Sequence, residues 1–187
     1  MGEGGNLHEK LLRLRARAKI LLASDMETAK GIIDKYSRNI IGVFTDGRFP
    51  NQGGERDTAG LELVQHAQGG HRYLPILLQS KNLELKEAAE GLGVRFLHKE
   101  DPMLYQGIEE FMLEGMSFGE FIFRMPDGAE IARASNLEQF VEKVEEVAVE
   151  SIEFHATRNE FSHWLRARTE FSLAASMRPM RLEDFDD

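Results

Sequence analysis

The sequence contains no cysteine. This absence excludes disulfide bonds, thiolate metal sites and cysteine nucleophiles, and it is typical of proteins from a reducing compartment. Long apolar runs are also missing, because none approaches the roughly 18 residues that a membrane-spanning helix needs. The first ten residues, MGEGGNLHEK, lack the apolar centre of a signal peptide. We therefore expect a cytoplasmic protein with no membrane partner.

Positive charge is scarce as well. The chain has 23 Lys and Arg residues against 32 Asp and Glu residues, for a formal net charge of -9. Nucleic acids and anionic membranes require a positive surface that displaces their counterions. The one basic cluster, RLRARAK at residues 13–19, falls mostly on a predicted helix, and we interpret it as a solvated face. We expect no nucleic-acid partner.

The first two thirds of the chain alternate between short apolar segments and segments with helical periodicity. We predict strands at residues 19–24, 40–46, 73–80 and 94–99, and helices at residues 7–17, 25–39, 57–68, 83–93 and 102–116. The strands lack polar alternation, which is typical of a parallel sheet covered by helices on both faces. The pattern predicts an α/β domain over residues 1–116.

The pattern changes after residue 116. Residues 121–134 alternate around a PDG turn, which predicts a β-hairpin. A helix is predicted from Asn136 to about residue 147, and an aromatic-rich helix pair at residues 149–179. We therefore predict a second, smaller α+β module at residues 117–187.

Four polar residues come at the ends of the predicted parallel strands: Asp25, Asp46, Ser80 and Lys99. Functional groups of open parallel sheets gather at this edge. A carboxylate there can accept a phosphoryl group, with a hydroxyl and an ammonium group contacting its oxygens and a divalent metal offsetting the charge. Two simpler interpretations stay open: Asp46 as a turn residue, and Asp25 as the N-cap of the next helix rather than a metal ligand.

This set resembles the receiver domain of two-component response regulators. Asp46 and Pro50 match the phosphoacceptor and the proline that follows it, Ser80 matches the hydroxyl after the fourth strand, and Lys99 matches the lysine after the fifth. The resemblance implies a flavodoxin-like fold, with Asp46 at the phosphoacceptor position and Ser80 and Lys99 at switch positions. It also implies Mg²⁺ as the cofactor of phosphorylation and a histidine kinase as a candidate partner.

The chain departs from the receiver pattern at its start. Receivers bind their metal through an acidic pair after the first strand, but here a predicted helix comes first and residues 19–24 fit the second strand. Only Asp25 and Asp46 are then candidate metal ligands, and we expect Asp46 to be phosphorylated poorly or not at all. A sheet without its first strand has apolar edges. We therefore expect a homo-oligomer, strand exchange, or pairing of residues 19–24 with residues 40–44.

A second resemblance covers nearly the whole chain. Segments such as NIIGVFTDGRFP, FGEFIFRMPDGAEIARA and RNEFSHWLRARTEF are similar to the N-terminal region of large bacterial phosphoenolpyruvate synthase-like (PEP/pyruvate-binding) proteins. The resemblance implies a regulatory module whose partners are the adjacent domains of a larger phosphotransferase or a separate protein. The chain has no Gly-rich ATP loop and no phospho-carrier histidine motif, so we expect no enzymatic activity from it alone.

The segment HATRNEFSHW suggests a site in the second module. Helical spacing would place His155 and Asn159 on one face, with Arg158 beside them and Trp164 further along. We weigh a small-ligand or docking site against a simpler interpretation, in which Trp164 belongs to the core and His155 is a hydrogen-bonded polar group. The functional alternatives to a receiver-like regulator are accordingly a protein-interaction scaffold and a small-ligand sensor.

Overall fold

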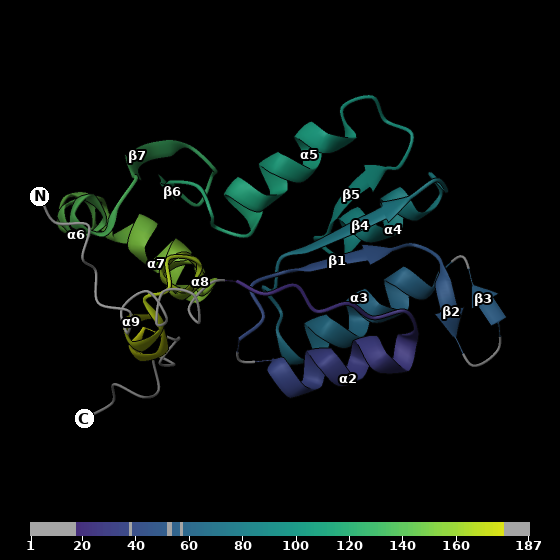
Figure 1. The fold of residues 1–187 in the computed structure, drawn as a ribbon. Coiled ribbons are helices and arrows are strands. Elements are labelled where there is room, and N and C mark those ends of the chain that lie inside the picture. Colours follow the sequence, from purple (N-terminus) through teal and green to yellow (C-terminus); the bar gives the residue numbers. More distant parts are fainter. Residues whose placement is uncertain (1–17, 38, 52–53, 57, 178–187) are drawn as a thin grey trace, which may run out of the picture.

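A computed structural model describes residues 18–37, 39–51, 54–56 and 58–177. The predicted helix at residues 7–17 lies outside this range. The described chain is a mixed α/β structure in which a three-stranded parallel sheet is followed by a hairpin-and-helix module (Figure 1). None of the helices in the described part of the chain has the length and apolar character needed to span a membrane.

The parallel sheet consists of β1 (Val43–Asp46), β4 (Ile76–Ser80) and β5 (Arg95–His98), in the order β1-β4-β5. Three of the four predicted strands are therefore confirmed. β4 lies in the middle, and its Leu77 and Leu78 side chains are fully buried. This burial explains the unbroken apolar run in the sequence, because a central strand is covered on both faces.

Helices cover both faces of the sheet. They are α2 (Met26–Tyr36), α3 (Ala59–Gly70), α4 (Leu85–Gly91) and α5 (Leu104–Glu110). Figure 1 shows α2 and α3 on one side of the sheet and α5 on the other. The main core joins the apolar faces of α2, α3 and α4 to the sheet, through buried residues such as Met26, Ile33, Leu63, Val64, Leu78 and Ala89.

The strand predicted at residues 19–24 is wrong. Residues 18–25 contain no strand, and the side chains of Ile20 and Leu22 are 87% and 86% exposed. An apolar run becomes a strand only when a neighbouring backbone takes up its hydrogen bonds, and β1 pairs with β4 alone among the described residues. The predicted pairing with residues 40–44 is therefore not formed.

A short hairpin replaces the expected loop after Asp46. Strands β2 (Phe49–Asn51) and β3 (Gly54–Arg56) pair antiparallel, with Pro50 opposite Glu55. The next helix, α3, has Thr58 at its N-cap without a side-chain hydrogen bond. Asp57, where the sequence predicts this helix to begin, lies outside the described residues.

The long helix predicted at residues 102–116 is interrupted. Pro102 lies in a turn before α5, and after Glu110 the helix continues as a π-helical turn, η1 (Phe111–Gly115). The Phe111 ring is buried and meets the Phe44 ring of β1 edge-on, with 5.4 Å between centroids. This contact links the edge of the sheet to the chain that enters the second module.

The second module is built from β6 (Phe121–Arg124), β7 (Glu130–Ala134), α6 (Leu137–Glu146), α7 (Val149–Thr157), α8 (Glu160–Ala167) and α9 (Phe171–Ser176). The predicted hairpin and the predicted helix after Asn136 are confirmed, and the Asn136 side chain accepts a hydrogen bond from the Gln139 N–H. The expected helix pair is three short helices. Aromatic side chains form the core of the module, chiefly Phe121, Phe123, Phe140, Phe161 and Trp164.

Two hydrophobic cores thus follow each other along the chain. The first ends at Phe96, and the second begins at Phe121. The domain boundary at residues 116 and 117 stays a prediction, and it falls between the two cores.

The exposed segment before α2 gives a first testable prediction. Replacing Ile20 and Leu22 with serine is expected to lower the fraction of oligomer, because contact between copies would bury these exposed side chains against the edge of β1, which has no partner strand among the described residues. Light scattering after size exclusion measures the change. Leu83→Ser, at a 61% exposed apolar side chain on another loop, is the control. A strictly monomeric parent chain would contradict the expectation.

A second prediction concerns the approach of α3 to β1. A Cβ atom at Gly60 would lie 2.3 Å from the Asp46 carbonyl oxygen and 2.8 Å from the Gly47 Cα, both of them backbone atoms. Gly60→Ala is expected to lower the free energy of unfolding by about 1–3 kcal/mol. The matched control is Gly31→Ala in α2, where a Cβ meets nothing within 4 Å and alanine should stabilise by about 0.5–1 kcal/mol. Chemical denaturation measures both.

Candidate functional site

Three of the predicted residues meet at the carboxyl edge of the parallel sheet. Asp46 ends β1, Ser80 ends β4 and Lys99 directly follows β5. Lys99 Nζ makes an ion pair with Asp46 Oδ2 across the end of the central strand. The other carboxylate oxygen of Asp46 accepts a hydrogen bond of 3.2 Å from the Arg48 N–H. Both partners of the ion pair are partly exposed, so the pair is accessible from solution.

Ser80 is buried at the same edge. Its Oγ accepts a hydrogen bond of 3.1 Å from the Asn82 N–H, and its carbonyl oxygen accepts one of 3.0 Å from the Lys99 N–H. A Cβ at Gly47 would lie 2.8 Å from Ser80 Oγ. The serine hydroxyl therefore lies against the backbone that follows Asp46. Backbone hydrogen bonds join Ser80 to the Lys99 side of the site.

Backbone hydrogen bonds connect the residue after Asp46 to β4 and to the start of α3. The Gly47 N–H donates to the Gln79 carbonyl at 2.7 Å, and the Gly60 N–H donates to the Gly47 carbonyl at 2.9 Å. Only glycine allows α3 to begin so close to Asp46. The Gly residues at positions 47 and 60 thus allow Ser80 and the start of α3 to pack closely against the backbone at Asp46.

Asp25 is a helix N-cap, as the simpler interpretation has it. Its Oδ1 accepts from the Thr28 N–H at 2.8 Å, and its Oδ2 accepts from the Thr28 hydroxyl at 2.8 Å and the Ser24 hydroxyl at 3.3 Å. The hydrogen bond from the Thr28 backbone, followed by that from its side chain, lowers the pKa of Asp25. Both carboxylate oxygens are therefore engaged within the first turn of α2.

The donor set at the sheet edge does not fit a divalent cation. Asp46 is ion-paired with Lys99, and Asp25 is used as a cap. In the part of the chain that the structure describes, no group of three or more His, Asp or Glu residues is arranged to hold a metal ion. Mg²⁺ requires octahedral oxygen coordination through carboxylates or substrate phosphates. The carboxylate of Asp46 alone offers too few oxygen ligands for this coordination.

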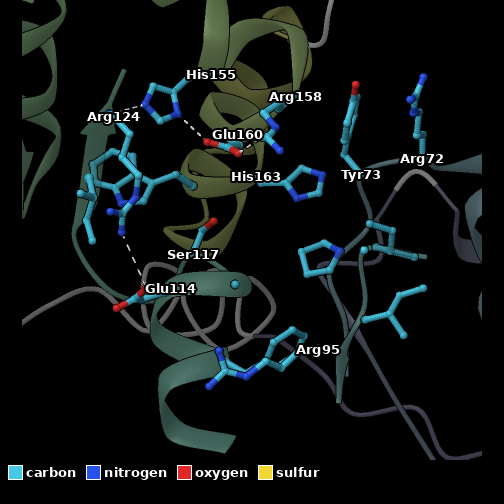
Figure 2. Close-up of a pocket in the computed structure, with 18 of the residues that line it drawn as sticks. Arg72, Tyr73, Arg95, Glu114, Ser117, Arg124, His155, Arg158, Glu160 and His163 are labelled. Atoms are coloured by element: carbon cyan, nitrogen blue, oxygen red, sulfur yellow. Dashed lines mark hydrogen bonds and ion pairs between the residues drawn. The ribbon is translucent and has the colours of Figure 1, made fainter. Parts of the chain in front are cut away.

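The side chain of His155, in α7, is buried against β6 and α8 (Figure 2). Its Nε2 accepts a hydrogen bond of 2.8 Å from the Arg124 N–H, so the ring proton is on Nδ1, which donates to Glu160 Oε2 at 2.5 Å. Both nitrogen atoms of the neutral ring are therefore hydrogen-bonded, and the ring packs edge-on against Phe121. The interpretation of His155 as a hydrogen-bonded polar group is confirmed.

The helical face expected to carry His155 and Asn159 does not exist. α7 ends at Thr157 and α8 begins at Glu160, and Asn159 between them has a left-handed backbone with φ of 60°. Asparagine tolerates this conformation better than most residues, which explains the break. Arg158 instead lies exposed over the Phe154 ring, 4.5 Å from its centroid.

Trp164 belongs to the core of the second module. It is fully buried, and its Nε1 donates to the Gly119 carbonyl at 3.1 Å. Arg168 stacks on the indole at 3.6 Å and donates to the carbonyls of Ser117 and Gly119. Burial lowers the pKa of Arg168 to about 10, so the guanidinium stays charged at neutral pH. The sequence alone does not indicate this role of Arg168.

A cleft of about 840 Å³ lies beside this core, at the end of the sheet opposite to Asp46. His155, Arg158 and Trp164 line it from the second module, together with Glu160 and His163, but Asn159 does not. Its other wall contains Arg72, Tyr73 and Arg95, which sequence reasoning missed (Figure 2). No local motif marks these residues, because they meet the second module only through tertiary folding.

Comparisons of the chain with protein-family models, with curated proteins and with solved structures find no match.

The capping role of Asp25 gives a prediction about pH. Because its folded pKa is depressed, Asp25 stabilises the protein above its unfolded pKa, and this contribution is lost as pH falls through the folded pKa, below the usual value of 3.8. Asn is as good an N-cap as Asp but does not titrate. The difference in Tm between the parent chain and Asp25→Asn should therefore favour the parent at neutral pH and shrink in acid. A difference independent of pH would contradict the expectation.

Proposed function

We propose that this chain is a receiver-like regulatory module, non-catalytic by itself, in which Asp46 and Lys99 form the switch position. The ion pair between Lys99 Nζ and Asp46 Oδ2 carries the proposal. It joins the ends of β1 and β5, two strands that are not neighbours and are separated by β4. A change of charge on either side chain alters a contact that spans the whole sheet edge.

The arrangement of the sheet supports this assignment. Three parallel strands in the order β1-β4-β5, with helices on both faces, agree with the last three strands of a flavodoxin-like sheet. Asp46 and Ser80 end their strands and Lys99 directly follows its strand, in the receiver order. We also propose, from the sequence resemblance, that the module belongs to a phosphoenolpyruvate synthase-like protein and contacts its adjacent domains or a separate protein such as a kinase.

The chemistry of the edge favours regulation through contacts over efficient phosphorylation. A phosphoryl group on Asp46 would add negative charge where the described residues offer no set of carboxylates for a divalent cation. We therefore propose that Asp46 is phosphorylated poorly or not at all. A partner that offers a cation to Asp46 or an anion to Lys99 would open the pair and shift the population of states.

A contact route leads from this edge to the second module. Phe44 lies in β1, two residues before Asp46, and its ring meets Phe111 in η1. The Cβ of an alanine at Gly42, just before β1, would lie 2.9 Å from the Met116 side chain at the end of η1. A displacement of β1 therefore reaches the chain segment that enters the second module, and π-helical turns are frequent at functional positions.

A protein-interaction scaffold is the second candidate function. The shortage of metal donors at Asp46 and the exposed apolar segment around Ile20 and Leu22 favour it. In a scaffold the Asp46–Lys99 ion pair has no regulatory role: it stabilises one edge of the sheet and does not affect the second module. The two functions differ in how far a perturbation of Asp46 travels.

Backbone amide NMR distinguishes the two. Asp46→Asn and Lys99→Met are each expected to shift the same set of amide resonances, which extends through β1 to η1 and the second module. The matched control is Glu100→Gln, which breaks the exposed Lys81–Glu100 ion pair of 2.8 Å at the same edge and should have only local effects. Shifts for Asp46→Asn as local as those for Glu100→Gln would favour the scaffold.

Phosphorylation is tested directly by incubating the full chain with Mg²⁺ and acetyl phosphate, followed by intact mass measurement. We expect at most a minor phosphorylated fraction, absent from Asp46→Asn. Complete conversion that depends on Asp46 would overturn the proposed poor reactivity. Beryllofluoride, a phosphoryl mimic, should correspondingly cause little change in the amide spectrum.

A further inference from the structure

The cleft between the two cores is built from segments far apart in sequence and lies away from the Asp46 edge. One wall contains the amino ends of β4 and β5, with Leu74, Pro75 and Gly93, and the other contains β6, α7 and α8. Its volume of about 840 Å³ falls within the range of small-molecule sites, which occur preferentially between structural units. We propose that this cleft binds a small phosphate-bearing anion, independently of the function proposed for Asp46.

Four arginines from separate elements line this cleft. Arg72 precedes β4, Arg95 lies in β5, Arg124 ends β6 and Arg158 follows α7. Planar guanidinium groups are the side chains best suited to bidentate binding of phosphate oxygens. The cleft also contains four glutamates, Glu110, Glu114, Glu120 and Glu160, so its formal charge is zero in a molecule with a net charge of -9. It therefore repels anions less than most of the surface does.

The acidic residues of the cleft differ in how closely they pair with its arginines. Glu110 binds Arg95 at 3.1 Å, and Glu120 pairs with Arg133 outside the cleft. Glu114 is 3.8 Å from Arg124, which is beyond hydrogen-bond length. Arg72 has no acidic partner within the described residues.

The buried His155 explains why Arg158 is only loosely held. The Arg124 N–H fixes the ring so that Nδ1 donates to Glu160 Oε2. This hydrogen bond ties Glu160 Oε2 to the buried ring, and Glu160 Oε1 makes only a long ion pair of 3.9 Å with Arg158 Nε. His155 is thus a positioning residue, which leaves the guanidinium of Arg158 able to bind an external anion.

Aromatic rings lie beneath Arg72 and Arg158, the two arginines of the cleft without a close acidic partner among the described residues. Arg158 lies over Phe154, and Arg72 lies over Tyr73 at 5.7 Å from the ring centroid. Figure 2 shows Arg72 and Tyr73 on the wall opposite Arg158 and His163, with the imidazole of His163 pointing toward Tyr73. A guanidinium stacked on a ring is held in place while its N–H groups stay available. An anion bound by both Arg72 and Arg158 would contact both structural units.

The test titrates the full chain with inorganic phosphate and with pyrophosphate at constant ionic strength, using amide and indole NMR signals. We expect saturable shifts at the cleft, including the Trp164 indole. The double variant Arg72→Gln and Arg158→Gln should weaken binding by at least about tenfold, because each removes a charge-assisted contact. The matched control is Lys35→Gln, which removes another cation stacked on a tyrosine, Tyr36, but outside the cleft. It should leave the affinity unchanged.

Three outcomes would overturn the proposal. The first is the absence of saturable binding of either anion at millimolar concentrations. The second is an equal loss of affinity in the Lys35→Gln control and the double variant, which would indicate general charge attraction. The third is a set of shifts centred on Ser80 and Lys99, which would place the anion at the other end of the sheet.

Discussion

The position of β4 is the constraint on which both sites depend. This strand pairs with β1 on one side and β5 on the other, and its side chains are buried on both faces. Its carboxyl end brings Asp46 and Lys99 to either side of Ser80, and its amino end forms part of the floor of the cleft. Since a slip of one residue would reverse the facing of every side chain, the register of β4 determines both sites together.

The two sites differ in how they are built. At the carboxyl edge, one ion pair and a few backbone hydrogen bonds join strands of a single sheet. At the amino end, side chains of two hydrophobic cores face each other, and arginines supported by aromatic rings line the space between them. The contact of Phe44 with Phe111 connects the sheet to the second module along its edge.

Sequence patterns predicted what depends on local order and burial. The apolar run of β4 and the capping signals of Asp25 and Asn136 have local physical causes, and these elements formed where expected. The absence of strand pairing at residues 19–24 could not be predicted, because apolar character does not reveal whether a partner backbone is present. The break at Asn159 was missed because a single left-handed residue interrupts an otherwise helical pattern.

The cleft was harder to predict from sequence. Arg72 and Arg95 belong to segments without a motif, and their proximity to Arg158 follows only from how the two cores lie against each other. His155 could be recognised as a polar group in an aromatic segment, but its effect on Glu160 depends on the Arg124 N–H in another element.

Arg168 has a further consequence for how the chain can be divided. Its guanidinium binds the carbonyls of Ser117, Gly119 and Trp164, so the end of α8 is fastened to the segment where the second module begins. A fragment that ends before Arg168 would remove its hydrogen bonds to all three carbonyls, leave Gly119 with the Trp164 indole as a donor, and uncover one face of Trp164. The smallest intact unit of this module therefore has to extend from Ser117 to at least Arg168. The segment where the module begins and the residue after α8 are held together by the same hydrogen bonds.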